Sequence, residues 1–385
     1  MRTIDVTPVV MRVFPKCCLW ILFLVCSCLA VSCSGAYGDS VQGTKVQMRH
    51  SSLLEISDCD GYSVVEVKNP WGKGLLERYI LVPYDSVMPA GLPKGTVLRT
   101  PLKRTILFSG VHASLFEELG VLATVAGVCD RRYIYSSLLQ EAIEDGAVAD
   151  CGSSLNVNSE IVAQVNPDAI FVLPYENGGY GKLDKMSYPL VECADYMESS
   201  PLGCAEWMRF YGRLVGCAEK SDSLYEMVCN EYEALSRMVE NVSEHPKLMC
   251  ELKSSSAWYV PGGNSTMGQM YRDAGADYLF ADYDAVGSVP LSFEVVLDKA
   301  SDADIWLFKY NALTDYTYSS LLAGFQGYSH FKPFREKNIY ACNTGRNNIF
   351  EESSFHPERL LKELVALFHP LLIPGYRHVY YEKIR

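Results

Sequence analysis

The sequence lacks the motifs by which many enzymes are recognised, and it is poor in positive charge. It contains no G-x-S-x-G, G-x-x-x-x-G-K-[ST], G-x-G-x-x-G or H-E-x-x-H pattern, so no nucleophile elbow, phosphate-binding loop or zinc-protease helix is predicted. Its 34 lysines and arginines stand against 46 aspartates and glutamates, which gives a net charge of −12. No lysine- or arginine-rich run interrupts this balance, so the chain would repel a phosphate backbone, and nucleic acid is not an expected partner.

The sequence also lacks any C-x-x-C pair, although it contains 14 cysteines. This absence argues against a zinc knuckle or a thioredoxin-type site. Apolar neighbours, such as Val128 beside Cys129, favour buried thiols that act as small hydrophobic residues, while a disulfide in an exported protein stays open. Nine cysteines follow Cys33, namely Cys59, Cys129, Cys151, Cys193, Cys204, Cys217, Cys229, Cys250 and Cys342.

One long apolar run lies near the start, in "CCLWILFLVCSCLAVSC". Its core of about fifteen residues is shorter than the ~20 that a membrane-spanning helix needs, so residues 1–33 are predicted to be a signal peptide. The ending "LAVSC" resembles the lipobox of bacterial lipoproteins, which implies that Cys33 is lipidated and that the protein is a periplasmic, membrane-anchored lipoprotein. Ala30 stands where that pattern prefers leucine, so Cys28 and an uncleaved anchor stay open as alternatives.

The length and texture of the rest predict two α/β lobes. A chain of 385 residues exceeds the roughly 250–300 that a single core holds. Strand and helix patterns alternate on both sides of a long helical stretch, "SDSLYEMVCNEYEALSRMVENV", and the first strand, "RTILFS", leads to a helix predicted from Ser114 to Gly120. We expect an α/β fold of two Rossmann-like lobes, each a small, mainly parallel sheet flanked by helices. A long connector helix joins the lobes, with a ligand cleft between them.

These patterns divide the chain into five expected segments. Within the second, strands on both sides of a turn at Pro70 are predicted between Gly61 and Val82. The segments are the signal peptide with lipobox (1–33), a tether and N-terminal β extension (34–100), the N-terminal lobe (101–200), connector helices (201–245) and the C-terminal lobe with its tail (246–385).

Two stretches repeat one pattern, "SEIVAQVNPDAIFV" and "FEVVLDKASDADIWLF". In each, a glutamate stands two residues past a candidate helix N-cap: Glu160 follows Asn158, and Glu294 follows Ser292. A single acid there would only complement the helix dipole, by ~0.3–1 kcal/mol. Two acids in matching frames favour a shared contact instead.

Together with "RTILFSGVHASLFEELGVLATVAGV" and "GGNSTMGQMYRDAGADYLF", these stretches resemble the substrate-binding proteins of ABC importers. The resemblance is to the helix-linked subclass for iron–siderophore complexes, haem and cobalamin. It implies a monomer without a cofactor of its own, which captures a large metal chelate and delivers it to the permease dimer of the inner membrane. It also implies that Glu160 and Glu294 dock onto basic residues of that permease. A ferric siderophore or haem is the favoured ligand, and cobalamin or another corrinoid is the alternative.

Ligand-binding residues are expected beyond the carboxyl ends of the strands, where open α/β sheets bind their ligands. Aromatic and amide side chains dominate these positions, and they suit a large, flat, partly apolar ligand. Lys309 and Arg346 are the candidate counter-charges for an anionic chelate. The predicted set is Ser109, His112, Tyr175, Glu176, Asn177, Trp258, Tyr259, Asn264, Lys309, Tyr310 and Arg346.

Other functions stay open. Direct zinc or manganese binding needs several histidines and a carboxylate, for which His112, His330 and His356 are the available set. An enzyme would need an acid and a base, such as Asp168 and Asp302 near the ends of the two repeated stretches. Their matching places at predicted strand starts favour a structural role, so no catalytic residue is expected. A structural or adhesive lipoprotein would not need the matched glutamates.

Overall fold

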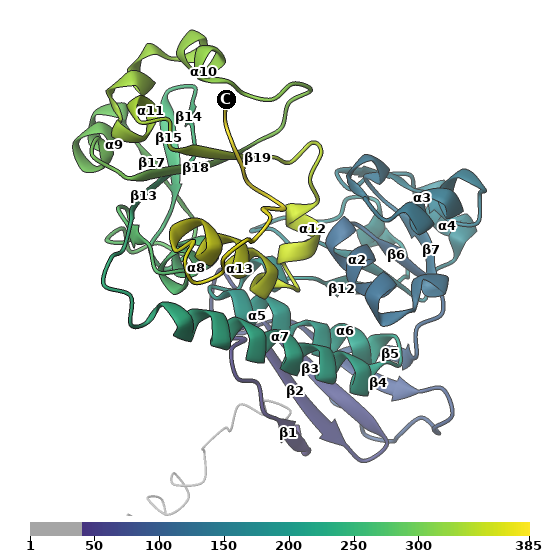
Figure 1. Ribbon diagram of the computed structural model, residues 1–385. Coiled ribbons are helices and arrows are strands. Elements are labelled where there is room, and N and C mark those ends of the chain that lie inside the picture. The colour runs from purple at the N-terminus through teal and green to yellow at the C-terminus, as the bar shows by residue number, and fades with distance from the viewer. Residues whose placement is uncertain (1–40) are drawn as a thin grey trace, which may run out of the picture. The chain divides into compact units, whose positions relative to one another are not determined.

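The computed structural model describes residues 41–385 (Figure 1). The expected signal peptide, the lipidation of Cys33 and the first part of the tether lie outside these residues. Within the described part of the chain, every helix is too short or too polar to span a bilayer.

The N-terminal extension forms a five-stranded sheet in the order β1-β2-β3-β4-β5. The first four strands pair antiparallel, and β5 pairs parallel to β4. The predicted turn joins β3 to β4, and Asn69 Oδ1 accepts a hydrogen bond from the Trp71 N–H there. The strands are β1 (Thr44–Val46), β2 (Leu54–Cys59), β3 (Tyr62–Lys68), β4 (Leu75–Pro83) and β5 (Thr96–Thr100).

Two buried glutamates hold the chain between β1 and β2. The Glu206 carboxylate accepts hydrogen bonds from the backbone N–H groups of Arg49, His50 and Ser51, at 2.8 to 3.1 Å. Glu198 accepts the backbone N–H groups of the next two residues, at 2.9 and 3.1 Å. These bonds replace the water that the two carboxylates lose on burial, and they fasten the extension to the helices that follow the N-terminal lobe.

The N-terminal lobe contains a parallel sheet in the order β12-β11-β6-β7-β8. Its first helix begins one turn before the predicted Ser114, because the Ser109 side chain accepts the Val111 N–H and caps the helix there. Gly120 ends that helix with a φ of 77°, as predicted for a residue without a Cβ atom. The strands are β6 (Thr105–Leu107), β7 (Val125–Val128), β8 (Ala149–Asp150), β11 (Ala169–Val172) and β12 (Leu190–Glu192), and a hairpin adds β9 (Gly152–Ser153) and β10 (Asn156–Val157). The helices are α2 (Gly110–Leu119), α3 (Ser137–Glu144) and α4 (Ser159–Val165).

Three consecutive helices connect the lobes: α5 (Pro201–Glu206), α6 (Met208–Leu214) and α7 (Ala218–Val239). The long helix α7 has 22 residues, which confirms the predicted long helical stretch. Its apolar stripe is buried, and it packs against α6 and against the C-terminal lobe helix α13 (Pro357–Phe368) (Figure 1).

The C-terminal lobe contains a second five-stranded sheet in the order β16-β13-β18-β19-β20, in which β20 alone runs antiparallel to its neighbour. A separate antiparallel sheet has the order β14-β15-β17. Two helix-flanked, mainly parallel sheets confirm the expected fold class. The strands are β13 (Lys247–Cys250), β14 (Lys253–Ser254), β15 (Ala257–Pro261), β16 (Asp277–Tyr278), β17 (Ser288–Leu291), β18 (Ile305–Tyr310), β19 (Ile339–Asn343) and β20 (Glu382–Lys383). The helices are α8 (Thr266–Asp273), α9 (Phe293–Ala300), α10 (Tyr318–Gly324), α11 (Lys332–Arg335), α12 (Ile349–Ser353) and α13 (Pro357–Phe368).

Candidate functional site

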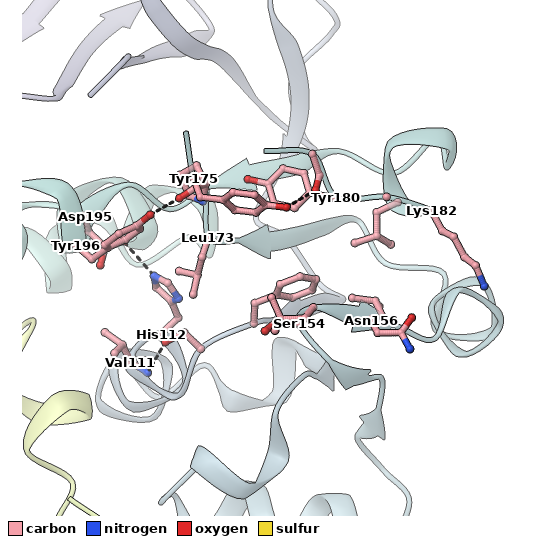
Figure 2. A pocket seen from close by; sticks show the side chains of 18 of the residues that line it. Val111, His112, Ser154, Asn156, Leu173, Tyr175, Tyr180, Lys182, Asp195 and Tyr196 are labelled. Atoms are coloured by element: carbon pink, nitrogen blue, oxygen red, sulfur yellow. Dashed lines mark hydrogen bonds and ion pairs between the residues drawn. The ribbon is translucent and has the colours of Figure 1, made fainter. Parts of the chain in front are cut away.

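A cavity of about 580 Å³ lies at the carboxyl edge of the N-terminal sheet (Figure 2). Residues that follow β6, β11 and β12 line it, together with the β9–β10 hairpin, and Ser354 after α12 completes the lining. Parallel strands deliver their carboxyl ends to one edge, so side chains far apart in sequence meet there. Six side chains define the walls: Phe108, Leu173, Tyr175, Tyr180, Lys182 and Tyr196.

Three tyrosines line this cavity, and the hydroxyl group of each is already engaged in a hydrogen bond. Tyr175 donates to the Gly179 carbonyl at 2.7 Å, and Tyr196 donates to the Pro174 carbonyl. The Tyr180 hydroxyl donates to Glu192, and burial together with this carboxylate raises its pKa, so it stays neutral. The walls therefore offer aromatic surface rather than free hydroxyl groups.

A buried polar group lies at the base of the cavity. His112 Nε2 lies 3.3 Å from Asp195 Oδ1, which also accepts the Tyr211 hydroxyl at 2.7 Å. The other ring nitrogen, Nδ1, is buried without a hydrogen-bond partner, and in Figure 2 it lies on the side of the ring away from Asp195. The Cys193 thiol is close enough that ligand atoms of His112, Cys193 and Asp195 all lie within 4.8 Å of one another. These three residues form a group that is able to hold a metal ion.

The structure brings three of the predicted N-terminal ligand residues to this cavity: Ser109, His112 and Tyr175. His112 lies in the first turn of α2 rather than in a loop, because the chain turns from β6 directly into the helix. Glu176 and Asn177 stand on the exposed turn that follows Tyr175, and they are outside the cavity lining.

The predicted C-terminal residues do not meet at one place. Tyr259 and Lys309 line a separate depression of about 390 Å³, and Tyr310 and Arg346 line another of about 330 Å³. Asn264 is exposed, and its side-chain amide donates to the Asp284 carboxylate of the same lobe.

The two candidate counter-charges already have carboxylate partners. Lys309 Nζ lies 2.7 Å from Glu251 Oε1, and although burial opposes it, the Glu251 charge raises the pKa of Lys309 well above its usual value. Arg346 Nη1 lies 3.1 Å from the Asp315 carboxylate, and both of these side chains are exposed. In the state that the structure describes, neither cation is left without a counter-ion.

Trp258 does not line any of these hollows, contrary to the prediction. Its side chain is 0% exposed, and its indole Nε1 donates to the Cys250 carbonyl at 2.9 Å. It stands on β15, where it packs against Trp306 with a centroid distance of 5.7 Å and against Phe331. The residue belongs to the core of the C-terminal lobe.

The three histidines of the alternative metal site do not converge. His112 lies at the cavity base, His330 is exposed after α10, and His356 bridges Glu118 and Glu358 at 2.5 and 2.8 Å. The side chains that could share a metal ion with His112 are instead Cys193 and Asp195, which follow β12.

Sequence reasoning missed several lining residues, among them Tyr180, Lys182, Asp195 and Tyr196. A signal was present for Asp195 and Tyr196, since they directly follow the predicted strand "YPLVEC". Tyr180 and Lys182 had no comparable signal. They belong to a glycine-rich loop, and its position at the cavity depends on the tertiary structure.

The two glutamates of the repeated pattern lie where the sequence predicts them, relative to their helices. Asn158 accepts the Glu160 N–H at 3.1 Å, and Ser292 caps α9, so each glutamate is exposed in the first turn of its helix. Bonds from its own backbone N–H and from Ser292 lower the pKa of Glu294, which keeps it ionised. Docking onto a permease stays a prediction.

The two lobes touch through the segment around α12. Glu351 Oε1 accepts the Tyr135 N–H at 3.0 Å, and the Tyr135 hydroxyl donates to the Thr344 carbonyl at 2.8 Å. Burial raises the pKa of Glu351 to about 7. An added Cβ on Gly110 would lie 2.0 Å from Glu351 Oε1, so this contact needs the glycine.

Two α/β lobes joined by a helix, with an aromatic cavity at the carboxyl edge of one sheet, define a solute-binding protein of the two-lobe class. The family model for periplasmic binding proteins matches residues 112–344, and the chain belongs to this family. An uncharacterized lipoprotein of Methanocaldococcus jannaschii is 25% identical over 290 residues, which cover 72% of this chain and 68% of that protein.

Solved structures share the fold at low sequence identity. A periplasmic haem-binding protein from Pseudomonas aeruginosa has a TM-score of 0.57 and 15% identity, with 74% of this chain and 98% of that one covered. An ABC-type Fe³⁺-hydroxamate transport protein from Saccharomonospora viridis has a TM-score of 0.55 and 17% identity, with coverages of 70% and 94%. Helicobacter pylori CeuE with Ni(II) bound has a TM-score of 0.56 and 13% identity, with coverages of 73% and 88%.

Proposed function

We propose that this protein is the substrate-binding lipoprotein of an ABC importer, and that it captures an iron complex, either a ferric siderophore or haem. The complex binds in the cavity at the carboxyl edge of β6, β11 and β12. Glu160 and Glu294 then dock the loaded protein onto basic residues of the permease in the inner membrane. Lipidation at Cys33 keeps it at the membrane.

The observation that carries this proposal is the chemistry of the 580 Å³ cavity. Its volume lies within the roughly 300–1,000 Å³ typical of sites for small organic ligands. Three tyrosine rings with engaged hydroxyls suit a flat ligand with apolar faces, and Lys182 at the rim suits an anionic edge. The solved structures whose names describe haem and Fe³⁺-hydroxamate transport support the same ligand class.

Transport of a bare metal ion is the second candidate function, and a specific observation favours it. The imidazole, thiol and carboxylate of His112, Cys193 and Asp195 lie within 4.8 Å of one another, and two of them, His112 and Asp195, line the cavity. Nitrogen, sulfur and oxygen donors together suit a transition metal such as zinc or nickel rather than calcium or magnesium. Burial raises the pKa of the Cys193 thiol, so metal binding there would have to displace its proton.

Titrations with defined ligands test the proposal. Haem, ferrioxamine, cyanocobalamin and Zn²⁺ are added separately to the purified protein, and binding is followed by absorbance and by calorimetry. Tyr175→Ala removes an aromatic wall and should raise the dissociation constant of the bound chelate about tenfold, since an aromatic contact and its buried area contribute roughly 1–2 kcal/mol.

Tyr259→Ala is the matched control from the other lobe, because the two residues are similarly exposed, at 54% and 49%. We expect a smaller change in this variant. Binding of cyanocobalamin alone would replace the iron complex by the corrinoid alternative. Binding of Zn²⁺ alone, lost in Cys193→Ser, would establish the bare metal ion as the ligand. Chelate binding that Tyr175→Ala leaves unchanged would place the site elsewhere.

A further inference from the structure

The described residues contain a second group of metal-ligating side chains, outside the cavity described above. Cys229 and Glu233 stand four residues apart on α7, so they share one face of this helix. His50 reaches the same place from the segment between β1 and β2. The ligand atoms of these three residues all lie within 4.8 Å of one another.

The distances fit a tetrahedral metal site. Zinc lies about 2.3 Å from a thiolate sulfur and about 2.0–2.2 Å from imidazole nitrogen and carboxylate oxygen, so neighbouring donors in a tetrahedron are roughly 3.4–3.6 Å apart. Cys229 Sγ and Glu233 Oε1 are already 3.4 Å apart. The distances from the His50 ligand atom to the other two have to shorten by at most about 1.4 Å, which a half-buried side chain achieves by a rotation.

His50 is held in the way that metal-binding histidines are usually held. Its Nδ1 lies 2.6 Å from the Tyr225 hydroxyl, which leaves Nε2 to bind a metal. A hydrogen bond of this kind on the second nitrogen fixes the ring orientation of metal-ligating histidines. Its backbone N–H donates to the buried Glu206 at 2.8 Å, so the main chain that carries the ring is also fixed.

Metal binding at the Cys229 thiol requires the loss of its proton. Burial and the neighbouring Glu233 raise the pKa of Cys229 to about 11, while the Arg49 guanidinium acts in the opposite direction. The thiol is therefore protonated at neutral pH, and an incoming divalent cation must release this proton to the solvent.

We propose that His50, Cys229 and Glu233 bind one divalent transition-metal ion of the zinc class, which ties the N-terminal extension to the connector helix α7. The nitrogen, sulfur and oxygen donor set suits Zn²⁺, Co²⁺ or Ni²⁺ and disfavours Ca²⁺ and Mg²⁺. A fourth position stays open to water. This site is independent of the proposed chelate transport.

Cobalt substitution tests the site on the full-length protein after treatment with a chelator. Co²⁺ bound by a thiolate gives a charge-transfer band in the near ultraviolet. We expect one equivalent of Co²⁺ to produce this band and excess Zn²⁺ to abolish it. Cys229→Ser should lose the band, and Glu233→Gln and His50→Gln should each weaken Co²⁺ binding by more than tenfold.

Two cysteine variants serve as matched controls. Cys217→Ser changes another thiol next to the start of α7, and Cys193→Ser changes the thiol beside His112 and Asp195. Both should keep the band. A band that survives in Cys229→Ser, or that is lost in Cys193→Ser, would overturn the proposal, and so would the absence of any band in the unmodified protein.

Thermal unfolding provides a second readout that does not depend on colour. Zn²⁺ should raise the midpoint of the unmodified protein, because a ligand that binds only the folded state stabilises it. The midpoint of folded Cys229→Ser should not respond to Zn²⁺. An equal rise in both proteins would contradict the proposed ligands.

Discussion

The helix-to-strand unit of the N-terminal lobe, α4 to β11, and that of the C-terminal lobe, α9 to β18, share their start and differ in their length. Both helices begin at a side-chain cap, followed by an exposed glutamate. In the first unit, Asp168 precedes the strand and accepts the N–H groups of Lys103 and Arg104 at 2.7 and 3.0 Å. Its counterpart in the second unit is Asp304 and not the predicted Asp302, since Asp304 accepts the Lys247 N–H at 2.9 Å.

The two lobes also differ at the carboxyl edges of their sheets. The N-terminal strand ends surround a cavity with apolar aromatic walls. The C-terminal strand ends carry two ion pairs, Lys309 with Glu251 and Arg346 with Asp315. Hydrogen bonds from Asn343 and Tyr310 lower the pKa of Asp315, so the pair of Arg346 and Asp315 stays charged. We infer that the helix starts have a role common to both lobes, whereas the N-terminal lobe contributes most of the ligand contacts.

The largest effect is expected from reversing the charge of the shared helix starts. Glu160→Arg and Glu294→Arg should each abolish permease docking and uptake, while the dissociation constant of the ligand stays unchanged. Surface ion pairs contribute only ~0.2–1 kcal/mol each, but partly desolvated pairs across a docked interface contribute several times more. Docking to permease in proteoliposomes, measured at increasing salt concentration, checks this.

Asp298→Arg is the matched control for these reversals, because this acid is exposed on the same helix as Glu294 but lies one turn later. It should dock normally. If both glutamate reversals support normal uptake, the two residues only begin their helices, and the repeat reflects a common local structure.

A smaller effect, on stability, is expected from replacing two aromatic residues that both belong to the predicted ligand-binding set. Trp258→Ala removes a fully buried indole from the C-terminal core and should lower the free energy of unfolding by about 3–5 kcal/mol. Tyr175→Ala removes a half-exposed ring at the cavity and should cost less than about 1 kcal/mol. Urea denaturation of both variants measures this. Similar losses in the two would show that Tyr175 is also a core residue.

Local features of the fold and site could be predicted from the sequence, and features set by distant partners could not. Asn158 and Ser292 were identifiable as caps because a cap bonds within three residues of itself. Trp258 is buried by β17 and Phe331. Both are distant in the sequence, so the residues next to Trp258 do not predict its burial. The ion pair of Lys309 is equally hidden from local sequence reasoning, since its partner Glu251 lies 58 residues away in the chain.

A further effect, smaller than that of Trp258→Ala, concerns a contact between the lobes. His356 lies between Glu118 of α2 and Glu358 of α13, with Nε2 and Nδ1 at 2.5 and 2.8 Å from the two carboxylates. Burial opposes its charge, but bonds to these carboxylates raise the pKa of His356 to about 9. The residue is therefore protonated at neutral pH, and it ties the N-terminal lobe helix to the C-terminal lobe.

The sign of the pH dependence follows from this raised pKa. The stabilisation is fully present below about pH 6.5, the pKa of an unfolded histidine, and it is lost as the pH rises through about 9. We expect His356→Gln to lower the free energy of unfolding by roughly 2–3 kcal/mol at pH 6, and the difference from the unmodified protein to shrink towards zero by about pH 10. Urea denaturation between these limits measures the difference, in which titrations common to both proteins cancel. A difference that stays constant with pH would mean that the imidazole fills space there without carrying charge.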